Sequence, residues 1–343
     1  MKPNIALVIG DPAGVGPELI VKLLADENTI AHANVFVIGN RATLAEAERA
    51  VGHSLNLDSV SQSTLGAVGT RDLTRPVILE WVGFNAPSFA TGQAAASNGA
   101  FMLDMLTLGA TLTRDGKTDA LCFAPLNKGA LRAGGMQQAD ELRWFEDLLG
   151  CHSYTGELNV LDTLWTSRVT SHVALKDVSA LLSPEGVADA AKLITESLQA
   201  SGKAMPRIGV CGLNPHNGDG GNYGREEIDI IEPGIALARA RGYAVDGPFP
   251  ADTIFVRAKN GQYDGIVTMY HDQGQIAMKL MGFERGVTVQ GGLPIPVTTP
   301  AHGTAYDITG RGIANVGAMK NAFDLACRMG AHRASQLREA KAA

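Results

Sequence analysis

Three histidines, His172, His216 and His271, each stand where a predicted strand ends. Imidazole is the commonest side-chain ligand for zinc and similar ions, and three ligands with one open position define a catalytic metal site. Because the carboxyl ends of parallel strands meet at one edge of a sheet, these three side chains could converge there. The pattern therefore indicates a shared metal ion, although each histidine alone could equally be a hydrogen-bonded loop residue.

Two lysines near predicted strand ends could handle protons or anions. Lys279 follows His271 by two helical turns, so both side chains would lie on roughly one face of a helix. A lysine beside a metal in a partly dry cleft can act as an acid or as an anion clamp. Lys128 begins a predicted helix just after a strand and allows the same interpretation. Simple solvent exposure is the alternative for both lysines.

Two glycine-rich loops are candidates for anion or cofactor binding. The first, Gly10–Pro17, resembles a phosphate loop but lacks the GK[ST] ending and the GxGxxG spacing, so a tight strand-to-helix turn explains it equally well. The second, His302–Asn315, leads into the last predicted helix. Backbone N–H groups around Gly310 and Gly312 could bind an anionic or adenosine group, and an ordinary surface loop is the alternative.

The composition is that of a folded protein, and it excludes several classes of partner. The 343 residues are 45% hydrophobic and 19% charged, which is sufficient for a large core. The net charge of -6 argues against DNA or RNA as the main partner. The four cysteines are widely spaced, so we expect buried reduced thiols in a cytoplasmic protein rather than a disulfide framework. No apolar stretch reaches the ~18 residues of a membrane span, and we expect no membrane partner.

Short apolar runs alternate with helical segments along the chain. The apolar runs predict buried strands at 5–9, 35–38, 121–124, 168–173, 208–211 and 266–269. Helices are predicted from residue 17 onward and at 42–51, 93–112, 140–149, 184–199, 226–241, 275–281 and 316–329. This alternation indicates an α/β fold with a mainly parallel or mixed sheet, whose ligands bind at the carboxyl ends of strands.

The chain resembles the 4-hydroxythreonine-4-phosphate dehydrogenase family over nearly its whole length. The resemblance lies in GDPAGVGPE (Gly10–Glu18), APLNKGAL (Ala124–Leu131), the strand that ends at His172, NPHNGDGG (Asn214–Gly221), PADT (Pro250–Thr253), YHDQG (Tyr270–Gly274) and HGTAYDITGRG (His302–Gly312). The last motif also looks like the cofactor loop of isopropylmalate and isocitrate dehydrogenases, whose fold the family shares. The resemblance implies two α/β domains with a cleft between them, one of residues 1–125 and 292–343 and the other of residues 126–291.

This resemblance implies an NAD- or NADP-dependent dehydrogenase that also needs a divalent metal such as zinc, magnesium or cobalt. The substrate would be a small hydroxy acid whose secondary alcohol is oxidised, with decarboxylation to follow. The family's metal ligands fall on His172, His216 and His271, and its substrate lysine falls on Lys279. The family's active site forms at a homodimer interface and takes metal ligands from both subunits, so one chain would not complete it alone.

Further site residues follow from the same resemblance. Lys279 and Asp252 are the candidates for proton transfer. The cofactor would bind at His302, Gly303, Asp307, Gly310 and Gly312. The candidate substrate contacts are Lys128, Asp140, Glu141, Arg143, Lys279, Thr288 and Val297.

Several substrate-contacting positions differ from the family pattern. The family's Gly-His-Thr-Glu motif matches Gln138–Glu141 here, so Ala139 replaces the histidine and Asp140 replaces the threonine. Further along the chain, a substrate-contacting asparagine and arginine of the family become Thr288 and Val297. Loss of one charge-assisted contact typically costs ~1.5–3 kcal/mol, and valine cannot replace the arginine fork.

The altered pocket leaves the substrate open. Arg143, in the altered helix, could replace the missing arginine as an anion clamp. One candidate substrate is 4-phosphohydroxy-L-threonine, and the other, slightly favoured by the altered pocket, is an unphosphorylated or carboxylated diol such as a cis-dihydrodiol. A three-histidine metal hydrolase is an alternative, although it leaves the loop at 302–312 without a role. A non-catalytic protein that binds a sugar acid or a metal is the third functional hypothesis, after the dehydrogenase and the hydrolase.

Overall fold

The chain forms two compact units. The computed structural model describes residues 2–60, 73–80 and 89–342. The first unit combines residues 1–152 with residues 293–343, and the second unit is the continuous segment 153–292. The first unit is therefore built from both ends of the chain, and the second unit interrupts it.

The unit boundary differs from the predicted one after residue 125, because the segment 126–152 belongs to the first unit. Its first helix, α6 (Lys128–Ala133), packs closely against α5 (Ala96–Arg114). A Cβ atom on Gly99 of α5 would lie 1.8 Å from the backbone oxygen of Ala130, so only glycine permits this approach. A contact of this kind between distant segments has no signature in the sequence pattern.

The described strands of the first unit are parallel and have the order β3-β4-β2-β1-β5-β12. Their bounds are β1 (Asn4–Val8), β2 (Asn34–Gly39), β3 (Asp58–Val60), β4 (Val77–Glu80), β5 (Ala120–Phe123) and β12 (Val297–Pro300). β1 and β2 are almost continuous apolar runs that are buried on both faces, as is typical of central parallel strands. The strands predicted at 5–9, 35–38 and 121–124 are confirmed.

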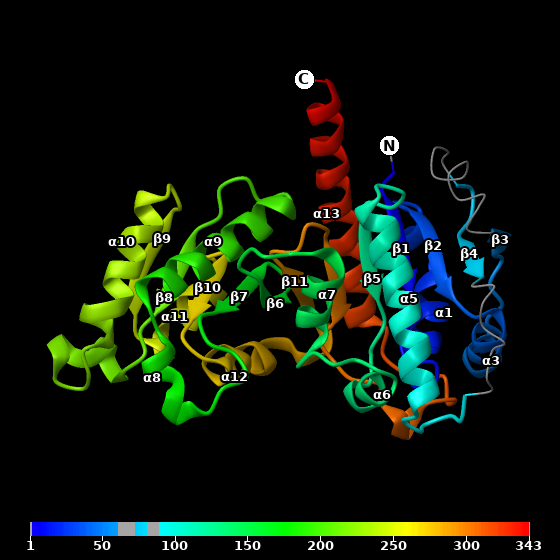
Figure 1. Ribbon diagram of the computed structural model, residues 1–343, viewed down its shortest axis with the longest axis horizontal. Coiled ribbons are helices and arrows are strands. Elements are labelled where there is room, and N and C mark those ends of the chain that lie inside the picture. The colour runs from blue at the N-terminus through cyan, green and yellow to red at the C-terminus, as the bar shows by residue number, and fades with distance from the viewer. Residues whose placement is uncertain (1, 61–72, 81–88, 343) are drawn as a thin grey trace. The chain divides into compact units, whose positions relative to one another are not determined.

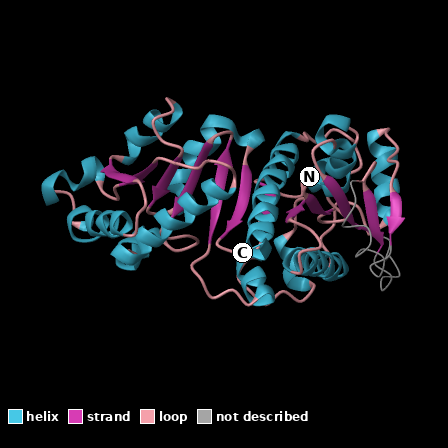
Figure 2. Cartoon of the chain, turned by 90° about the horizontal axis from the view of Figure 1, so that it is seen from above, coloured by secondary structure: helices cyan, strands magenta, loops and turns pink. Residues whose placement is uncertain are grey.

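Helices cover both faces of this sheet (Figures 1 and 2). Besides α5 and α6 they are α1 (Gly16–Leu24), α2 (Glu27–Ile30), α3 (Arg41–Val51), α7 (Glu141–Leu149) and α13 (Gly317–Ala342). Val8 and Leu121 face α5, whereas Ile5, three residues before Val8, and Ala120, one residue before Leu121, face α13. This alternation places α5 and α13 on opposite faces of the sheet.

The second unit contains a mixed sheet with the strand order β11-β6-β7-β10-β8-β9. Their bounds are β6 (Gly156–Leu161), β7 (Leu164–Arg168), β8 (Ile208–Cys211), β9 (Val245–Phe249), β10 (Gly265–Thr268) and β11 (Val287–Gly291). β7, β10, β8 and β9 are parallel, whereas β6 runs antiparallel to β7 and to β11. The carboxyl ends of β7, β10 and β8 therefore lie next to one another.

Helices also cover both faces of the second sheet (Figure 2). They are α8 (Val178–Leu181), α9 (Pro184–Ala200), α10 (Glu232–Ala240), α11 (Ala251–Lys259) and α12 (His271–Gly282). α9 packs against β6, β7, β8, β10 and β11, and α10 packs against α9. On the other face, Ile254 of α11 and Met278 of α12 share an apolar core with Leu161 and Ile266. This core fixes α12, the helix that carries two of the candidate site residues.

Several predicted elements differ from the structure. The strand predicted at 168–173 is wrong, because β7 ends at Arg168 and the next residues form a loop. Its neighbour β6 escapes prediction because Glu157 and Asn159 interrupt its apolar residues. The search for apolar runs also misses β9, β11, β12 and α11. The last helix continues to Ala342, beyond its predicted end.

The cysteines agree with the expected reduced thiols. Cys122, Cys211 and Cys327 are buried and free, and Cys151 is half-buried and free. Burial raises the pKa of the Cys122 thiol to about 12 and also raises the pKa values of Cys211 and Cys327. Within the described part of the chain, no helix is both long enough and apolar enough to cross a membrane.

Candidate active site

His172 and His271 lie side by side at the carboxyl ends of two neighbouring strands. Arg168, the last residue of β7, is in register with Thr268, the last residue of β10. His172 follows in the loop after β7, His271 begins α12, and the centres of the two rings are 5.8 Å apart. Two imidazoles on one ion have ring centres about 5–6 Å apart, since each metal–nitrogen bond is about 2.0–2.1 Å. This pair of side chains therefore fits a shared divalent ion.

The third candidate ligand, His216, lies in the loop after β8, the strand beside β10. Its ring contacts Tyr223, with 6.4 Å between the ring centres. Within residues 2–60, 73–80 and 89–342, no three His, Cys, Asp or Glu side chains are grouped closely enough to hold one ion. One copy of the chain thus brings together two of the three predicted ligands, and a shared site for all three stays a prediction.

A buried carboxylate holds the loop that follows β8. Glu227 is 1% exposed, and it accepts hydrogen bonds from the backbone N–H groups of Leu213 and Asn214 at 2.7 Å each. The side-chain amide of Asn214 donates to Glu227 and to Glu226. Hydrogen bonds from Ser179 and Asn214 lower the pKa of Glu226. These contacts stabilise a loop that the sequence analysis singled out without identifying its supports.

The same loop has an unusual backbone. His216, Asn217 and Asp219 all have a left-handed φ, between 45° and 56°. Each such non-glycine residue costs on the order of 1–3 kcal/mol, and strain of this kind clusters at functional sites. The strain agrees with a functional role for His216.

The two candidates for proton transfer, Lys279 and Asp252, also lie in the second unit. The helix predicted at 275–281 is confirmed and begins earlier, at His271. Lys279 is exposed on α12, two turns beyond His271 and on the same face of the helix. Asp252 is exposed in the first turn of α11. Their catalytic roles stay predictions.

Four of the predicted substrate contacts lie near one another in the first unit. Asp140 caps α7, because its carboxylate accepts a hydrogen bond from the backbone N–H of Arg143 at 3.0 Å. Threonine and aspartate are both favoured at helix N-caps, so aspartate in place of the family's threonine suits this position. Glu141 is buried, and its carboxylate lies 3.7 Å from Nζ of Lys128. The guanidinium of Arg143, the proposed anion clamp, pairs with Glu146 on the same helix.

The two changed positions further along the chain have different surroundings. Thr288 is half-buried on β11, opposite Asn159 of β6, whose side-chain amide lies 3.5 Å from the threonine hydroxyl. Val297 is fully buried on β12, opposite Leu121 of β5. The prediction that Val297 contacts the substrate is therefore wrong, because this side chain fills the core of the first unit. Thr288 stays a candidate.

The predicted cofactor loop, residues 302–312, is joined to the first glycine-rich loop. The N–H of Val15 donates to the backbone oxygen of Thr304 at 3.0 Å, and the Tyr306 hydroxyl donates to Asp11 at 2.6 Å. Burial raises the pKa of Asp11, and burial with the Asp11 contact raises the pKa of Tyr306. The two loops, which lie at opposite ends of the chain, therefore act as one structure.

Glu18 completes this connection. Its carboxylate is almost fully buried, and it accepts hydrogen bonds from the N–H groups of Gly310 and Gly312 at 2.5 and 2.8 Å. The prediction that these two N–H groups bind an anionic or adenosine group is wrong, because Glu18 already occupies them. Cofactor binding by other parts of the loop stays a prediction.

The first glycine-rich loop is a tight turn rather than a phosphate cradle. The N–H of Ala13 donates to the Asp11 side chain, and the N–H of Gly14 donates to the Asp11 backbone oxygen. The N–H of Asp11 itself donates to Pro125. Because these donors are engaged within the first unit, the loop supports its neighbours instead of binding an anion.

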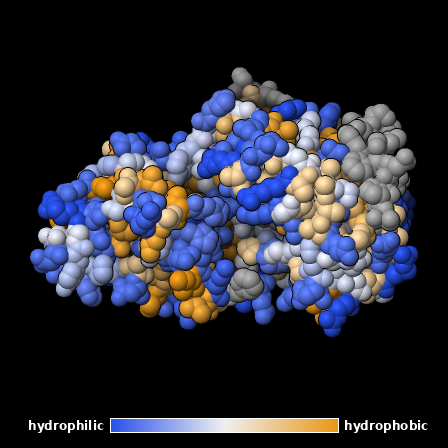
Figure 3. All heavy atoms as spheres, turned by 60° about the horizontal axis from the view of Figure 1, so that its bottom comes forward, coloured by the Kyte–Doolittle hydropathy of each residue, from blue (hydrophilic) through white to orange (hydrophobic). Residues whose placement is uncertain are grey.

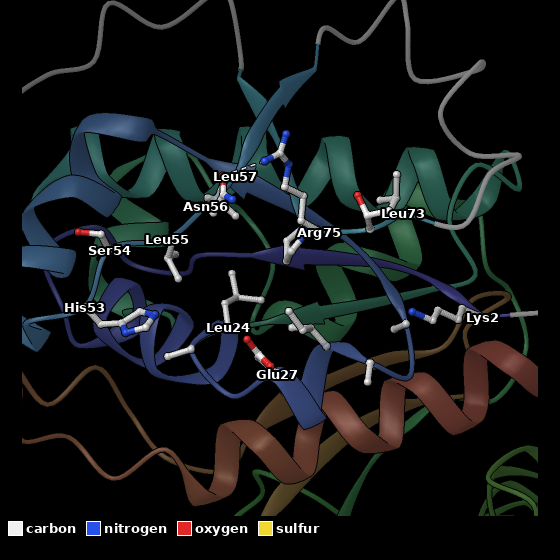
Figure 4. Close-up of a pocket in the computed structure, with 16 residues that line it drawn as sticks. Lys2, Leu24, Glu27, His53, Ser54, Leu55, Asn56, Leu57, Leu73 and Arg75 are labelled. Carbon is white, nitrogen blue, oxygen red and sulfur yellow. Dashed lines mark hydrogen bonds between the residues drawn. The ribbon is translucent and has the colours of Figure 1, made fainter.

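A cavity of about 510 Å³ lies elsewhere in the first unit (Figure 4). Its lining includes Ala33 and Pro76, which directly precede β2 and β4, and Lys2, which lies two residues before β1. It is therefore at the amino ends of the parallel strands, whereas the loops described above follow their carboxyl ends. Arg75, one of the residues that line the cavity, donates hydrogen bonds to Asp58 and Asn56. This cavity is separate from the candidate residues of the first unit.

Comparisons with known proteins agree over nearly the whole chain. A family model described as "Pyridoxal phosphate biosynthetic protein PdxA" matches residues 31–326. A Pseudomonas aeruginosa protein named "Putative 4-hydroxythreonine-4-phosphate dehydrogenase 2" is 52% identical over 334 residues, which cover 97% of this chain and 98% of that protein. The D-threonate 4-phosphate dehydrogenase of Cupriavidus necator is 38% identical, with 97% and 98% covered.

Solved structures give the same result. A 4-hydroxythreonine-4-phosphate dehydrogenase from Burkholderia phymatum has a TM-score of 0.81 and 34% identity, with 96% of this chain and 98% of that chain covered. A terephthalate 1,2-cis-dihydrodiol dehydrogenase from Burkholderia xenovorans has a TM-score of 0.69 and 28% identity, with the same shares covered. These likenesses confirm the predicted fold class. With its motifs, its fold and its relatives in agreement, this chain belongs to the PdxA family of dehydrogenases, oxidoreductases that act on a CH–OH group.

Proposed function

We propose that this chain is an NAD(P)- and divalent-metal-dependent dehydrogenase that oxidises the secondary alcohol of a phosphorylated four-carbon hydroxy acid and then decarboxylates it. The observation that carries the proposal is the pairing of His172 and His271 at adjacent strand ends, at a spacing suited to one ion. The names of the relatives supply the substrate class, because they include 4-hydroxythreonine-4-phosphate and D-threonate 4-phosphate dehydrogenases.

The described residues divide the chemistry among them. His172 and His271 would hold the ion, which supplies a Lewis acid for the alcohol oxygen. Lys279, on the same face of α12 as His271, would hold an anionic group of the substrate or pass a proton. The loop at 302–312 would contact the nicotinamide cofactor, and Asp11 and Glu18 would keep that loop in shape.

A homodimer is part of this proposal. The second unit exposes large apolar side chains on and near α8 and α12, and Figure 3 shows apolar groups gathered on one side of it. They include Leu175, Leu181, Ile276 and Leu280, the last of which is 84% exposed. Contiguous exposed apolar surface is typical of protein interfaces. A second copy on this surface would supply His216 as the third metal ligand.

The test is an assay of NAD(P)H formation with a panel of four-carbon hydroxy acids, each with and without a phosphate. The proposal predicts activity with a phosphorylated acid, loss of activity with a chelator and recovery with a divalent ion. His271→Ala should abolish metal-dependent activity, and His332→Ala, on α13, is the matched control. Full activity after complete removal of metal would contradict the role of the histidines.

A cis-dihydrodiol is the second candidate substrate. It is favoured by the likeness to the terephthalate dihydrodiol dehydrogenase. The assay distinguishes the candidates if a carboxylated cis-dihydrodiol is included in the panel. The hydrolase and the non-catalytic alternatives are set aside, because the relatives are dehydrogenases. A cytoplasmic location is proposed from the free buried thiols.

A further inference from the structure

A charged side chain is buried between the second sheet and α12. Arg168, at the end of β7, has a side chain only 7% exposed. Its guanidinium donates to Glu157 at 2.5 Å and to Asn159 at 2.8 Å, both on the neighbouring strand β6. A buried ion pair is weak evidence for stability, because loss of hydration offsets the attraction between the charges. The contacts at the two ends of this network indicate another role.

One end of the network reaches the loop that carries His172. Nε of Arg168 donates to the hydroxyl of Ser171 at 2.9 Å. Ser171 is the residue before His172, and the loop leaves the sheet directly after Arg168. The guanidinium therefore restrains the first turn of this loop, close to the histidine backbone.

The other end of the network reaches α12. The side-chain oxygen of Asn159 accepts from Arg168 and also from Nε2 of Gln275 at 2.6 Å. Gln275 lies one turn after His271 and one turn before Lys279, so the three share one face of α12. A hydrogen bond at Gln275 therefore limits both rotation and sliding of that face relative to β6.

We propose that Arg168 and Asn159 are positioning residues that hold His172 and His271 at the separation that one metal ion requires. The chain of hydrogen bonds runs from Ser171 through Arg168 and Asn159 to Gln275. It links the two elements that carry the histidines. The inference rests on the proposed metal site. It adds to that site two residues, Arg168 and Asn159, that would support the segments carrying the metal ligands.

The test compares three substitutions in the full-length protein. Asn159→Leu keeps a similar volume and removes the acceptor that joins Arg168 to Gln275. Asn159→Asp keeps an acceptor oxygen at this position and should rescue the connection. Gln275→Met breaks only the contact to α12, and it is the milder variant should Asn159→Leu fold poorly. Arg241→Met is the matched control, because it removes an arginine–carboxylate contact with Asp189 elsewhere in the same unit.

Two measurements are made on each variant. The first is the dissociation constant for Co²⁺ by calorimetry, with the visible spectrum of bound Co²⁺ as a report on ligand geometry. Loss of a residue that orients metal ligands typically weakens binding about 10–100-fold, and we expect this for Asn159→Leu. Gln275→Met should show a smaller loss, and Asn159→Asp and Arg241→Met should bind as the wild type does. The second measurement is hydrogen exchange of the α12 amides in the metal-free protein, which should accelerate in Asn159→Leu and Gln275→Met.

The outcomes separate the inference from the proposed function. If the wild-type protein binds no Co²⁺, the proposed metal site is wrong. The hydrogen-exchange data then test only whether Asn159 and Gln275 restrain α12. Unchanged exchange and unchanged Co²⁺ affinity in Asn159→Leu and Gln275→Met overturn the positioning role. A lower unfolding temperature in Asn159→Leu with wild-type affinity and spectrum reduces the network to a structural role and also overturns the inference.

Discussion

Glu18 shows how one buried carboxylate can shape a loop far away in the sequence. Its oxygens accept from the N–H groups of Gly310 and Gly312, and the first of these contacts spans 292 residues of sequence. A carboxylate suits this position because it offers acceptors in two directions, whereas an amide offers only one oxygen. The residue therefore stabilises a loop that we assign to the cofactor.

We predict that Glu18→Gln weakens cofactor binding more than it slows turnover. The amide group would face a backbone N–H and leave a buried donor unpaired, which costs about 1–3 kcal/mol. The loop should then sample other shapes, so the KM for NAD(P) should rise with a smaller change in kcat. Steady-state kinetics with varied cofactor would measure this, with the exposed Glu46→Gln as control. An unchanged KM would argue against the link between this loop and the cofactor.

Sequence patterns locate ligating residues better than they locate their supports. His271 is predictable because it follows an apolar run, and strand ends are where such a fold binds ligands. His172 is placed at a strand end by a strand predicted at 168–173, whereas the actual strand, β7, ends four residues before it. Glu18 and Arg168 give no comparable signal, since their partners lie in segments that only the fold brings near. Val297 shows the opposite error, because a match to a family position carries no information on whether the side chain is accessible.

At the scale of elements, small residues set how closely helices approach. α5 and α6 meet where a Cβ on Gly99 would overlap the backbone of Ala130. We predict that Gly99→Ala forces the two helices apart and lowers the free energy of unfolding by about 1–3 kcal/mol, as overpacking typically does. Denaturant titration would measure the change. Gly129→Ala on α6, where a Cβ meets only a side-chain oxygen at 3.2 Å, should be much less destabilising.

An ion pair links the beginning of the chain to the last helix. Asp26 caps α2, and Nζ of Lys320 on α13 donates to its carboxylate at 2.6 Å. This hydrogen bond, with a second from Thr29, lowers the pKa of Asp26 from 3.8 to about 2. A lowered pKa means that the folded state holds the proton less tightly than the unfolded state. The stabilisation is therefore present above pH 4 and disappears as the pH falls toward 2.

This pair gives a prediction that depends on pH. Lys320→Met should lower the unfolding temperature at pH 7, and the difference from the wild type should shrink as the pH falls below about 4. Thermal unfolding followed by circular dichroism at several pH values would measure the difference. A constant difference across that range would show that Lys320 acts through packing and not through Asp26.

Elements are predictable where their sequence follows a single period. The buried strands β1, β2 and β5 are continuous apolar runs, and the pattern finds them. β6 is missed because the polar layer beneath α12 requires Glu157 and Asn159 at alternate positions of a short strand. The polar residues of β6 that take part in the Arg168 network are thus the reason that the sequence pattern does not reveal this strand.

At the scale of the whole molecule, the exposed apolar surface of the second unit predicts self-association. Leu280→Glu would place a charge in the proposed dimer interface and should shift the protein toward monomer. Sedimentation velocity over a range of concentrations would measure the shift. Met205→Glu, at an equally exposed apolar position in the turn after α9, is the control and should leave the dimer intact. A wild-type protein that stays monomeric at every concentration would refute the interface.

The division of the first unit between both ends of the chain has a consequence for synthesis on the ribosome. The second unit is one continuous segment, so it can fold as soon as its own residues have emerged. The sheet of the first unit lacks β12 and the covering helix α13 until the final fifty or so residues leave the exit tunnel. A nascent chain stalled when residue 292 has just left the exit tunnel should therefore resist protease within residues 153–292 and be cut within residues 1–152. The chain would become active only after its last segment has been translated. Products of premature termination should therefore be inactive.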